Sequence, residues 1–86
     1  MEKKVTIKNE TGIHARPASL LVEEANKYDA NIKIDNDGKE VNAKSIMGIM
    51  SLGVKKNTEV IVKAEGVDAE VAVNSIVELI ESGFGE

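Results

Sequence analysis

Apolar and polar residues alternate in four short stretches of the chain, which is the pattern of half-buried β-strands. The first stretch covers roughly residues 2–8. The second and third flank Asn36-Asp37-Gly38, whose turn chemistry predicts a hairpin, and Gly66 ends the fourth. The alternating apolar positions are, stretch by stretch, Val5 and Ile7, then Ile32 and Ile34, then Val41 and Ala43, and finally Val60, Val62 and Ala64.

Three other stretches predict helices, the first and the third because they repeat apolar residues at the spacing of helical turns. The first ends near residues 26–28, and the second has only about two turns between a capping Ser45 and a closing Gly53. The third follows Asp68, which we expect to cap it, and ends at Ser82-Gly83. The inward positions of the first and third helices are Ala18, Leu21, Val22 and Ala25, and Ala69, Ala72, Val73, Ile76 and Ile80, with Val77 and Leu79 flanking.

The resulting element order is βαββαβα, with two βαβ crossovers and a hairpin between them. This order predicts an α+β fold in which a mainly antiparallel four-stranded sheet carries helices on one face. The 86 residues contain no linker or low-complexity segment, so we expect a single domain over residues 1–86. With one Phe, one Tyr and no Trp, aliphatic side chains must fill its core.

Composition and charge exclude several classes of function. The chain has no cysteine, and one histidine among scattered carboxylates gives no metal-ligand spacing, so neither a metal nor another cofactor is expected. A net charge of −4 with almost no aromatic side chains argues against a nucleic-acid surface. There is no Walker-type phosphate loop, which argues against an independent kinase. Because no apolar signal core or membrane-length run is present, we expect a cytoplasmic protein without direct membrane binding.

The segment Gly12-Ile13-His14-Ala15-Arg16-Pro17-Ala18 holds the only histidine, arginine and proline of the chain. Proline lacks an N–H and has a helical φ, so Pro17 predicts a helix that starts at about Ala15 or Arg16. His14 then lies at the helix entrance, where unpaired N–H groups and the helix dipole stabilise an anion. Arg16 adds a fixed positive charge beside it.

These residues suit phosphoryl transfer. A neutral imidazole is a nucleophile near pH 7 without a metal, and it becomes a leaving group again once its other nitrogen is protonated or hydrogen-bonded. A phosphoryl group on His14 carries about two negative charges, which the helix N–H groups and Arg16 receive without enclosing it. From local chemistry alone, the alternative is that His14 is an ordinary cap or surface residue.

The second helix is unusually apolar for its length. Its outer side should be solvated, so some of its large side chains are expected to remain exposed and to bind partners. In the alternative, the helix lies flat on the sheet edge and buries all of them. The side chains concerned are Ile46, Met47, Ile49 and Met50.

Residues 12–18, together with Lys44-Ser45-Ile46-Met47-Gly48-Ile49-Met50-Ser51-Leu52-Gly53, resemble HPr, the histidine-containing phosphocarrier family of the bacterial phosphoenolpyruvate-dependent sugar phosphotransferase system. The second segment is similar to the form found in low-GC Gram-positive bacteria. The resemblance spans the whole chain in length, element order and spacing of the two motifs. It implies an open-faced β-sandwich with sheet order 1-4-2-3 and three helices on one face.

The resemblance also implies the roles of the site residues. Enzyme I, charged by phosphoenolpyruvate, phosphorylates His14 at Nδ1, Arg16 receives the phosphoryl charge, and the group passes to a sugar-specific IIA domain. Ser45 corresponds to the regulatory serine phosphorylated by the ATP-dependent HPr kinase/phosphorylase, and the phosphoserine form binds a catabolite-control repressor, a transcription factor. The apolar side chains of the second helix form a common docking face. Phosphoserine at position 45 is expected to preserve the fold and to weaken binding to enzyme I.

The expected protein is therefore a monomeric phosphoryl carrier without turnover of its own. Some members of the family place lysines at the positions of Glu23 and Asn26, so this chain should differ in how charge affects its partners. Two other classes fit part of the sequence. One is a purely regulatory HPr-like module acting through phospho-Ser45, although such paralogues lack the histidine. The other is a generic ferredoxin-like interaction domain, phosphorylated at neither residue.

Overall fold

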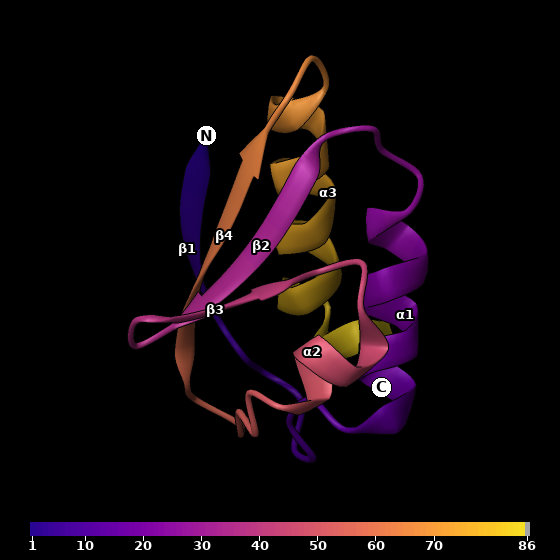
Figure 1. Cartoon of the computed structure of the whole chain (residues 1–86). Helices are drawn as coiled ribbons and strands as arrows, with labels where there is room; N and C mark the ends of the chain where they lie inside the picture. Colours follow the sequence, from indigo (N-terminus) through magenta and orange to yellow (C-terminus); the bar gives the residue numbers. More distant parts are fainter. Residues whose placement is uncertain (86) are drawn as a thin grey trace.

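The computed structural model describes residues 1–85 and shows one antiparallel sheet of four strands (Figure 1). The strands are β1 (Glu2–Thr6), β2 (Asn31–Asn36), β3 (Lys39–Asn42) and β4 (Glu59–Glu65). They lie in the order β1-β4-β2-β3, and every neighbouring pair is antiparallel. The sheet order implied by the family resemblance is thus confirmed.

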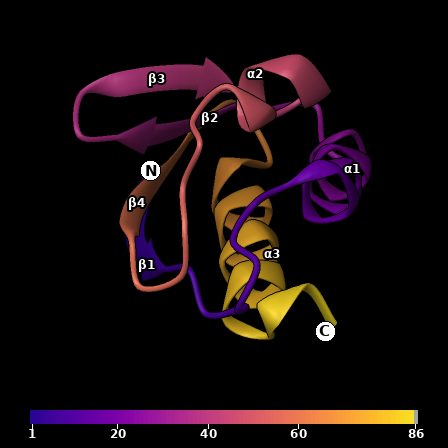
Figure 2. The same cartoon turned by 90° about the horizontal axis from the view of Figure 1, so that it is seen from below.

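Helices connect and follow the strands, and they are α1 (Ala15–Ala25), α2 (Ile46–Met50), α3 (Ala69–Glu81) and the short 3₁₀ helix η1 (Gly83–Gly85). α1 and α3 cover one face of the sheet, while α2 lies beyond the end of β3 and packs against α1 (Figure 2). The predicted α+β class, the βαββαβα order and the three helices are confirmed, with α1 and α3 on one face of the sheet and α2 at its end (Figure 2).

Aliphatic side chains fill the space between the sheet and the helices. Alternate residues of β4 point inward and are buried, as the period of a strand requires. Both predicted helical stripes are also confirmed, with Ala69 and Leu79 half-buried at the margin. Burying one large aliphatic side chain stabilises the fold by about 1.5–3 kcal/mol. The core therefore holds α1, and the site at its entrance, in a fixed position. The buried residues of α1 are Pro17, Ala18, Leu21, Val22 and Ala25.

The hairpin between β2 and β3 turns at Asp37 and Gly38, whose φ angles are 55° and 91°. Two consecutive positive φ angles are the geometry of a type I′ turn, for which Asp-Gly is a preferred pair. Asp35 Oδ1 accepts a hydrogen bond from the Gly38 N–H at 2.8 Å. The predicted hairpin is confirmed.

Asp68 stands directly before α3, as predicted, but its carboxylate does not cap that helix. Its two oxygens accept hydrogen bonds from the N–H groups of Asp29 and Ala30, at 2.9 and 2.8 Å, in the loop between α1 and β2. These donors, that of Asp29 foremost, hold the pKa of the Asp68 carboxyl below its ordinary value. Asp68 is thus the N-cap residue, as predicted, but it makes no side-chain capping bond because a loop distant in sequence offers the carboxylate two donors.

α3 ends at Ser82-Gly83, as predicted, and the residues after it also form part of the fold. Residues Gly83–Gly85 form η1, which the sequence patterns do not predict. Within it Phe84 has a φ of 58° and is only 3% exposed. Burial of this aromatic ring offsets the cost of a positive φ at a non-glycine residue.

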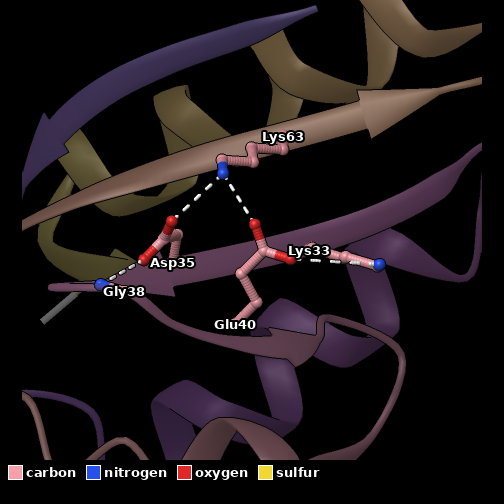
Figure 3. Close-up of polar contacts among 5 residues, drawn as sticks. All are labelled: Lys33, Asp35, Gly38, Glu40 and Lys63. Carbon is pink, nitrogen blue, oxygen red and sulfur yellow. Dashed lines mark hydrogen bonds and ion pairs between the residues drawn. The ribbon is translucent and has the colours of Figure 1, made fainter.

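The face of the sheet opposite the helices carries a network of charged side chains (Figure 3). Lys63 Nζ lies 2.6 Å from Glu40 Oε2 and 3.1 Å from Asp35 Oδ2. Glu40 first, and then Asp35, raise the pKa of Lys63, whereas Lys63 and the Gly38 N–H lower the pKa of Asp35. These pairs join β2, β3 and β4 across a polar surface that is separate from the helical layer.

Candidate functional site

His14 is the N-cap residue of α1, and its side chain is exposed. α1 begins at Ala15, the start predicted from Pro17, and Asn26 is its C-cap. Pro17 is buried in the first turn, where its missing N–H removes no intrahelical hydrogen bond. The helix therefore presents the imidazole to solvent at its positive end.

Gly12 sets the path by which the chain reaches His14. Its φ is +67°, and a Cβ at this position would lie 2.5 Å from the carbonyl oxygen of Val54. The N–H of Ile13 donates to the same oxygen at 3.1 Å. Only glycine fits here, because both the backbone angle and the close approach of Val54 exclude a side chain.

Thr11 and Asn9 reach the site from the same loop, and the sequence patterns single out neither. Thr11 Oγ1 lies 2.8 Å from His14 Nε2. Asn9 is only 5% exposed, and its Nδ2 donates to the carbonyl oxygen of Gly12 at 2.6 Å and to Thr11 Oγ1 at 3.3 Å. The available signal is an asparagine three residues before a glycine, since asparagine side chains often bond nearby backbone groups in turns.

The first turn of α1 offers hydrogen-bond donors to an anion. No residue within 1–85 accepts a hydrogen bond from the backbone N–H of Ala15 or Arg16. The guanidinium of Arg16 is exposed and, in the same part of the chain, makes no hydrogen bond or ion pair. Two backbone donors and a cation in one turn are suited to the oxygens of a phosphoryl group.

Ser45 caps α2, because its Oγ accepts a hydrogen bond from the Gly48 N–H at 3.1 Å. Gly53 follows the helix with a φ of +60°, so the predicted cap and the closing glycine are both confirmed. A Cβ at Gly48 would lie 3.3 Å from the hydroxyl of Ser45, so glycine leaves this half-buried hydroxyl room.

Three of the four apolar side chains of α2 are exposed, with Met47 at 78%, Ile46 at 43% and Met50 at 40%. Ile49 is fully buried in the core, so the expectation that it belongs to an exposed docking face was wrong. The physical reason is that a helix this short is held in place only if one of its apolar residues points inward. The docking patch is therefore defined here as Ile46, Met47 and Met50.

The entrance of α1 and the helix α2 lie at the same end of the molecule (Figures 1 and 2). α1 and α2 pack against each other, and the bond from Ile13 to Val54 ties the loop before His14 to the chain that follows α2. The two sequence motifs, far apart along the chain, thus belong to one surface region.

Two further features bear on the chemistry. In residues 1–85, no three His, Cys, Asp or Glu side chains are grouped so as to hold a metal ion. No helix of this part of the chain is long and apolar enough to cross a membrane. A hollow lined in part by Glu2, Lys33, Glu40 and Lys63 includes no residue of the segment around His14, so it is distinct from that site.

This fold and site define a class of protein, a small α+β domain that offers a surface histidine to its partners. The family model described as "PTS HPr component phosphorylation site" matches residues 1–82. The chain therefore belongs to the HPr family of the phosphotransferase system, whose phosphocarriers are components of that system and not independent enzymes. Membership of this family implies enzyme I and IIA domains as partners.

Solved structures support this assignment. HPr from Thermoanaerobacter tengcongensis is 55% identical, with a TM-score of 0.96 over 100% of this chain and 97% of that chain. The phosphocarrier protein HPr of Bacillus anthracis is 45% identical, with a TM-score of 0.89 over 93% and 95% of the two chains. Crh, the catabolite repression HPr of Bacillus subtilis, is 44% identical, with a TM-score of 0.70 over 93% and 95%. The chain is thus nearly as similar in sequence to Crh as to the HPr of Bacillus anthracis.

Proposed function

We propose that His14 accepts a phosphoryl group from phosphorylated enzyme I and passes it to the IIA domains of sugar permeases. The observation that carries this proposal is the exposed imidazole at the entrance of α1, with Nε2 2.8 Å from Thr11 Oγ1. The family resemblance implies that Nδ1 is the attacking nitrogen, and the contact of Nε2 with the hydroxyl is compatible with this. Its lone pair forms the N–P bond while the bond from phosphorus to the donor atom breaks, and donation to a IIA domain breaks the N–P bond in turn.

The first turn of α1 then stabilises the phosphoryl group. The N–H groups of Ala15 and Arg16 and the guanidinium of Arg16 are the donors that receive its charge. Pro17 contributes by fixing where the helix starts. Because these groups lie on one side and leave the phosphoryl group open to solvent, the phosphorylated state is stabilised without being trapped.

The docking patch serves as the common surface for enzyme I and the IIA domains. Methionine repacks at little cost, so Met47 and Met50 can adapt to partners of different shape. Ile49 supports the docking patch indirectly, because its burial in the core fixes the position of α2, the helix that carries the patch.

Ser45 is the regulatory site in this account. HPr kinase/phosphorylase transfers the γ-phosphoryl group of ATP to its hydroxyl oxygen and releases ADP. The product keeps an oxygen that accepts from the Gly48 N–H, so α2 stays capped. A dianion beside the docking patch has to be desolvated when enzyme I binds, which weakens that complex, whereas the catabolite-control transcription factor recognises the phosphoserine form.

A purely regulatory module acting through phospho-Ser45 is the second candidate, and the similarity to Crh favours it. The presence of His14, Arg16 and Pro17 favours the carrier. We further infer a monomer in the cytoplasm, because a carrier that offers one end to successive partners needs that end uncovered.

Mass spectrometry after two separate incubations tests both sites. With enzyme I and phosphoenolpyruvate, the wild-type protein should gain one acid-labile phosphoryl group, and His14→Gln should gain none. With HPr kinase/phosphorylase and ATP, the wild-type protein should gain one acid-stable group that is absent from Ser45→Ala. No modification of the wild-type protein by active enzyme I would refute the carrier, and acid-stable phosphate alone would favour the regulatory module.

A further inference from the structure

Asn9 is a buried polar side chain in a core that is otherwise apolar throughout residues 1–85. It lies between β1 and His14, and the function proposed above does not use it. Burying an amide side chain is unfavourable unless the amide forms hydrogen bonds. The hydrogen-bond partners of Asn9 therefore indicate the role of this residue.

The amide of Asn9 closes the loop that leads to His14. Its Nδ2 donates to the carbonyl oxygen of Gly12 at 2.6 Å, and the Gly12 N–H donates back to the carbonyl oxygen of Asn9 at 3.1 Å. Gly12 is also pressed against the backbone of Val54 on its other side. The residue two positions before His14 is therefore held from both directions.

The same nitrogen reaches the imidazole through one intermediate. Asn9 Nδ2 lies 3.3 Å from Thr11 Oγ1, and Thr11 Oγ1 lies 2.8 Å from His14 Nε2. An amide nitrogen only donates, so this contact uses one lone pair of the Thr11 oxygen. Asn9 therefore helps to fix the place of Thr11 Oγ1 beside Nε2, where the second lone pair can accept from Nε2–H.

We propose that Asn9 is a positioning residue for His14. It holds Thr11 so that Oγ1 accepts the proton of Nε2, which keeps the lone pair of the neutral ring on Nδ1, the nitrogen that attacks phosphorus. This inference rests on the proposed function and adds to it a residue two contacts away from the reacting atom. Aspartate matches asparagine in shape but cannot donate. Asn9→Asp therefore loses the bond to Gly12, sets a carboxylate against that carbonyl and displaces Thr11, whose hydroxyl it can meet only as an acceptor.

The test measures where the ring proton lies and how fast the ring is phosphorylated. Imidazole ¹⁵N shifts of the unphosphorylated protein should show the Nε2–H form predominating in the neutral ring of the wild type and a mixture of both forms in Asn9→Asp. Transfer from phosphorylated enzyme I should slow on the order of tenfold in Asn9→Asp, because small misplacement of a reacting group is costly. Asn74→Asp is the matched control. The same exchange at that position keeps an oxygen that accepts from Lys3 Nζ. The position of the proton on the His14 ring and the rate of transfer from enzyme I should therefore stay as in the wild type.

Thr11→Val is a second variant, useful in particular if Asn9→Asp does not fold. Thr11 is exposed, and this change leaves the bond from Asn9 to Gly12 in place, so the loop should persist while the ring proton redistributes. A wild-type ring-proton distribution in Thr11→Val or in folded Asn9→Asp overturns the proposal, as does a redistribution without a slower transfer. If the wild-type protein is not phosphorylated at all, the proposed function fails, and the ¹⁵N shifts still decide the role of Asn9.

Discussion

At the scale of single residues, the position of His14 depends most on a residue without a side chain. Gly12 combines a φ of +67° with a backbone oxygen 2.5 Å from where a Cβ would stand. The two constraints are of different kinds, one intrinsic to the residue and one imposed by the segment after α2. They can therefore be separated by experiment.

Gly12→Ala should lower the free energy of unfolding and displace the loop before His14. Gly53→Ala is the matched control, because Gly53 has a φ of +60° with nothing within 4 Å of its missing Cβ. The control should cost about 1–2 kcal/mol from the backbone angle alone. Gly12→Ala should cost at least about 1 kcal/mol more from overpacking, measured by urea unfolding. Equal costs would show that the contact with Val54 does not constrain the loop.

The residues of the site differ in how visible they are in the sequence. His14, Arg16 and Pro17 stand in one segment, and proline marks a helix start through its own covalent structure, so their place at the entrance of α1 is predictable. Asn9 and Thr11 are not predictable in this way. Their role follows from side-chain bonds across a tight loop, and polar residues between a strand and a helix usually signal only a break in both patterns.

At the scale of elements, α2 and the residue before it combine a cap, a buried anchor and an exposed patch within residues 45–50. Each part is open to a separate substitution. A change at the cap, Ser45, should affect both stability and regulation. A change at the buried anchor, Ile49, should affect stability, and a change in the docking patch should affect partner binding.

Ser45→Ala should lower the free energy of unfolding by about 1 kcal/mol, because the Gly48 N–H loses its acceptor. Ser45→Asp should recover most of this loss, since aspartate caps as well as serine does, yet it should slow phosphorylation by enzyme I. Thermal unfolding and the transfer rate measured on the same samples check this. Equal transfer rates for the alanine and aspartate variants would show that charge at position 45 has no effect on enzyme I.

Met47 and Ile49 are neighbouring apolar residues with opposite expected effects. Met47→Ala should change stability by less than about 0.5 kcal/mol but weaken binding to enzyme I. Ile49→Ala should destabilise the protein by about 2–5 kcal/mol through loss of core packing. Urea unfolding and titration calorimetry separate the two effects. Undiminished binding of enzyme I to Met47→Ala would remove this residue from the docking patch.

Asp68 predicts a dependence of stability on pH. Its pKa is lowered in the folded protein by the N–H groups of Asp29 and Ala30, so its contribution is complete above the unfolded value of about 3.9 and is lost as the pH falls through the folded value. The loss of stability between pH 7 and pH 3 should therefore be smaller in Asp68→Asn than in the wild type. Asp29→Asn is the control, because it removes a negative charge nearby but keeps the backbone N–H groups of residues 29 and 30 as donors to Asp68. Its stability should therefore depend on pH as that of the wild type does.

The elements themselves were largely predictable, because period-2 and period-3.6 patterns report directly which residues face the core. Asp68 shows where this local reasoning ends. An aspartate before a helix is normally its cap, but the distant loop of Asp29 and Ala30 competes for the same oxygens. Ile49 shows the same limit, since periodicity in a helix of five residues does not reveal which apolar residue is the anchor.

At the scale of the whole molecule, the two faces of the sheet have different uses. One face carries α1 and α3 over the core, and the other carries the paired charges of Lys63, Asp35 and Glu40 (Figure 3). The entrance of α1, with His14 as its N-cap residue, and α2, which carries the docking patch, lie at the same end of the molecule (Figure 2). Alternation alone predicts four strands but not their order. The order 1-4-2-3 came from the family resemblance, because pairing between distant strands leaves little trace in a local pattern.

The most direct test of the account is to identify the nitrogen that carries the phosphoryl group, by ³¹P and ¹⁵N NMR of labelled protein phosphorylated with enzyme I and phosphoenolpyruvate. We expect a bond from phosphorus to Nδ1 of His14, with Nε2 still protonated beside Thr11. A phosphorus atom bonded to Nε2, or to any residue other than His14, would contradict it.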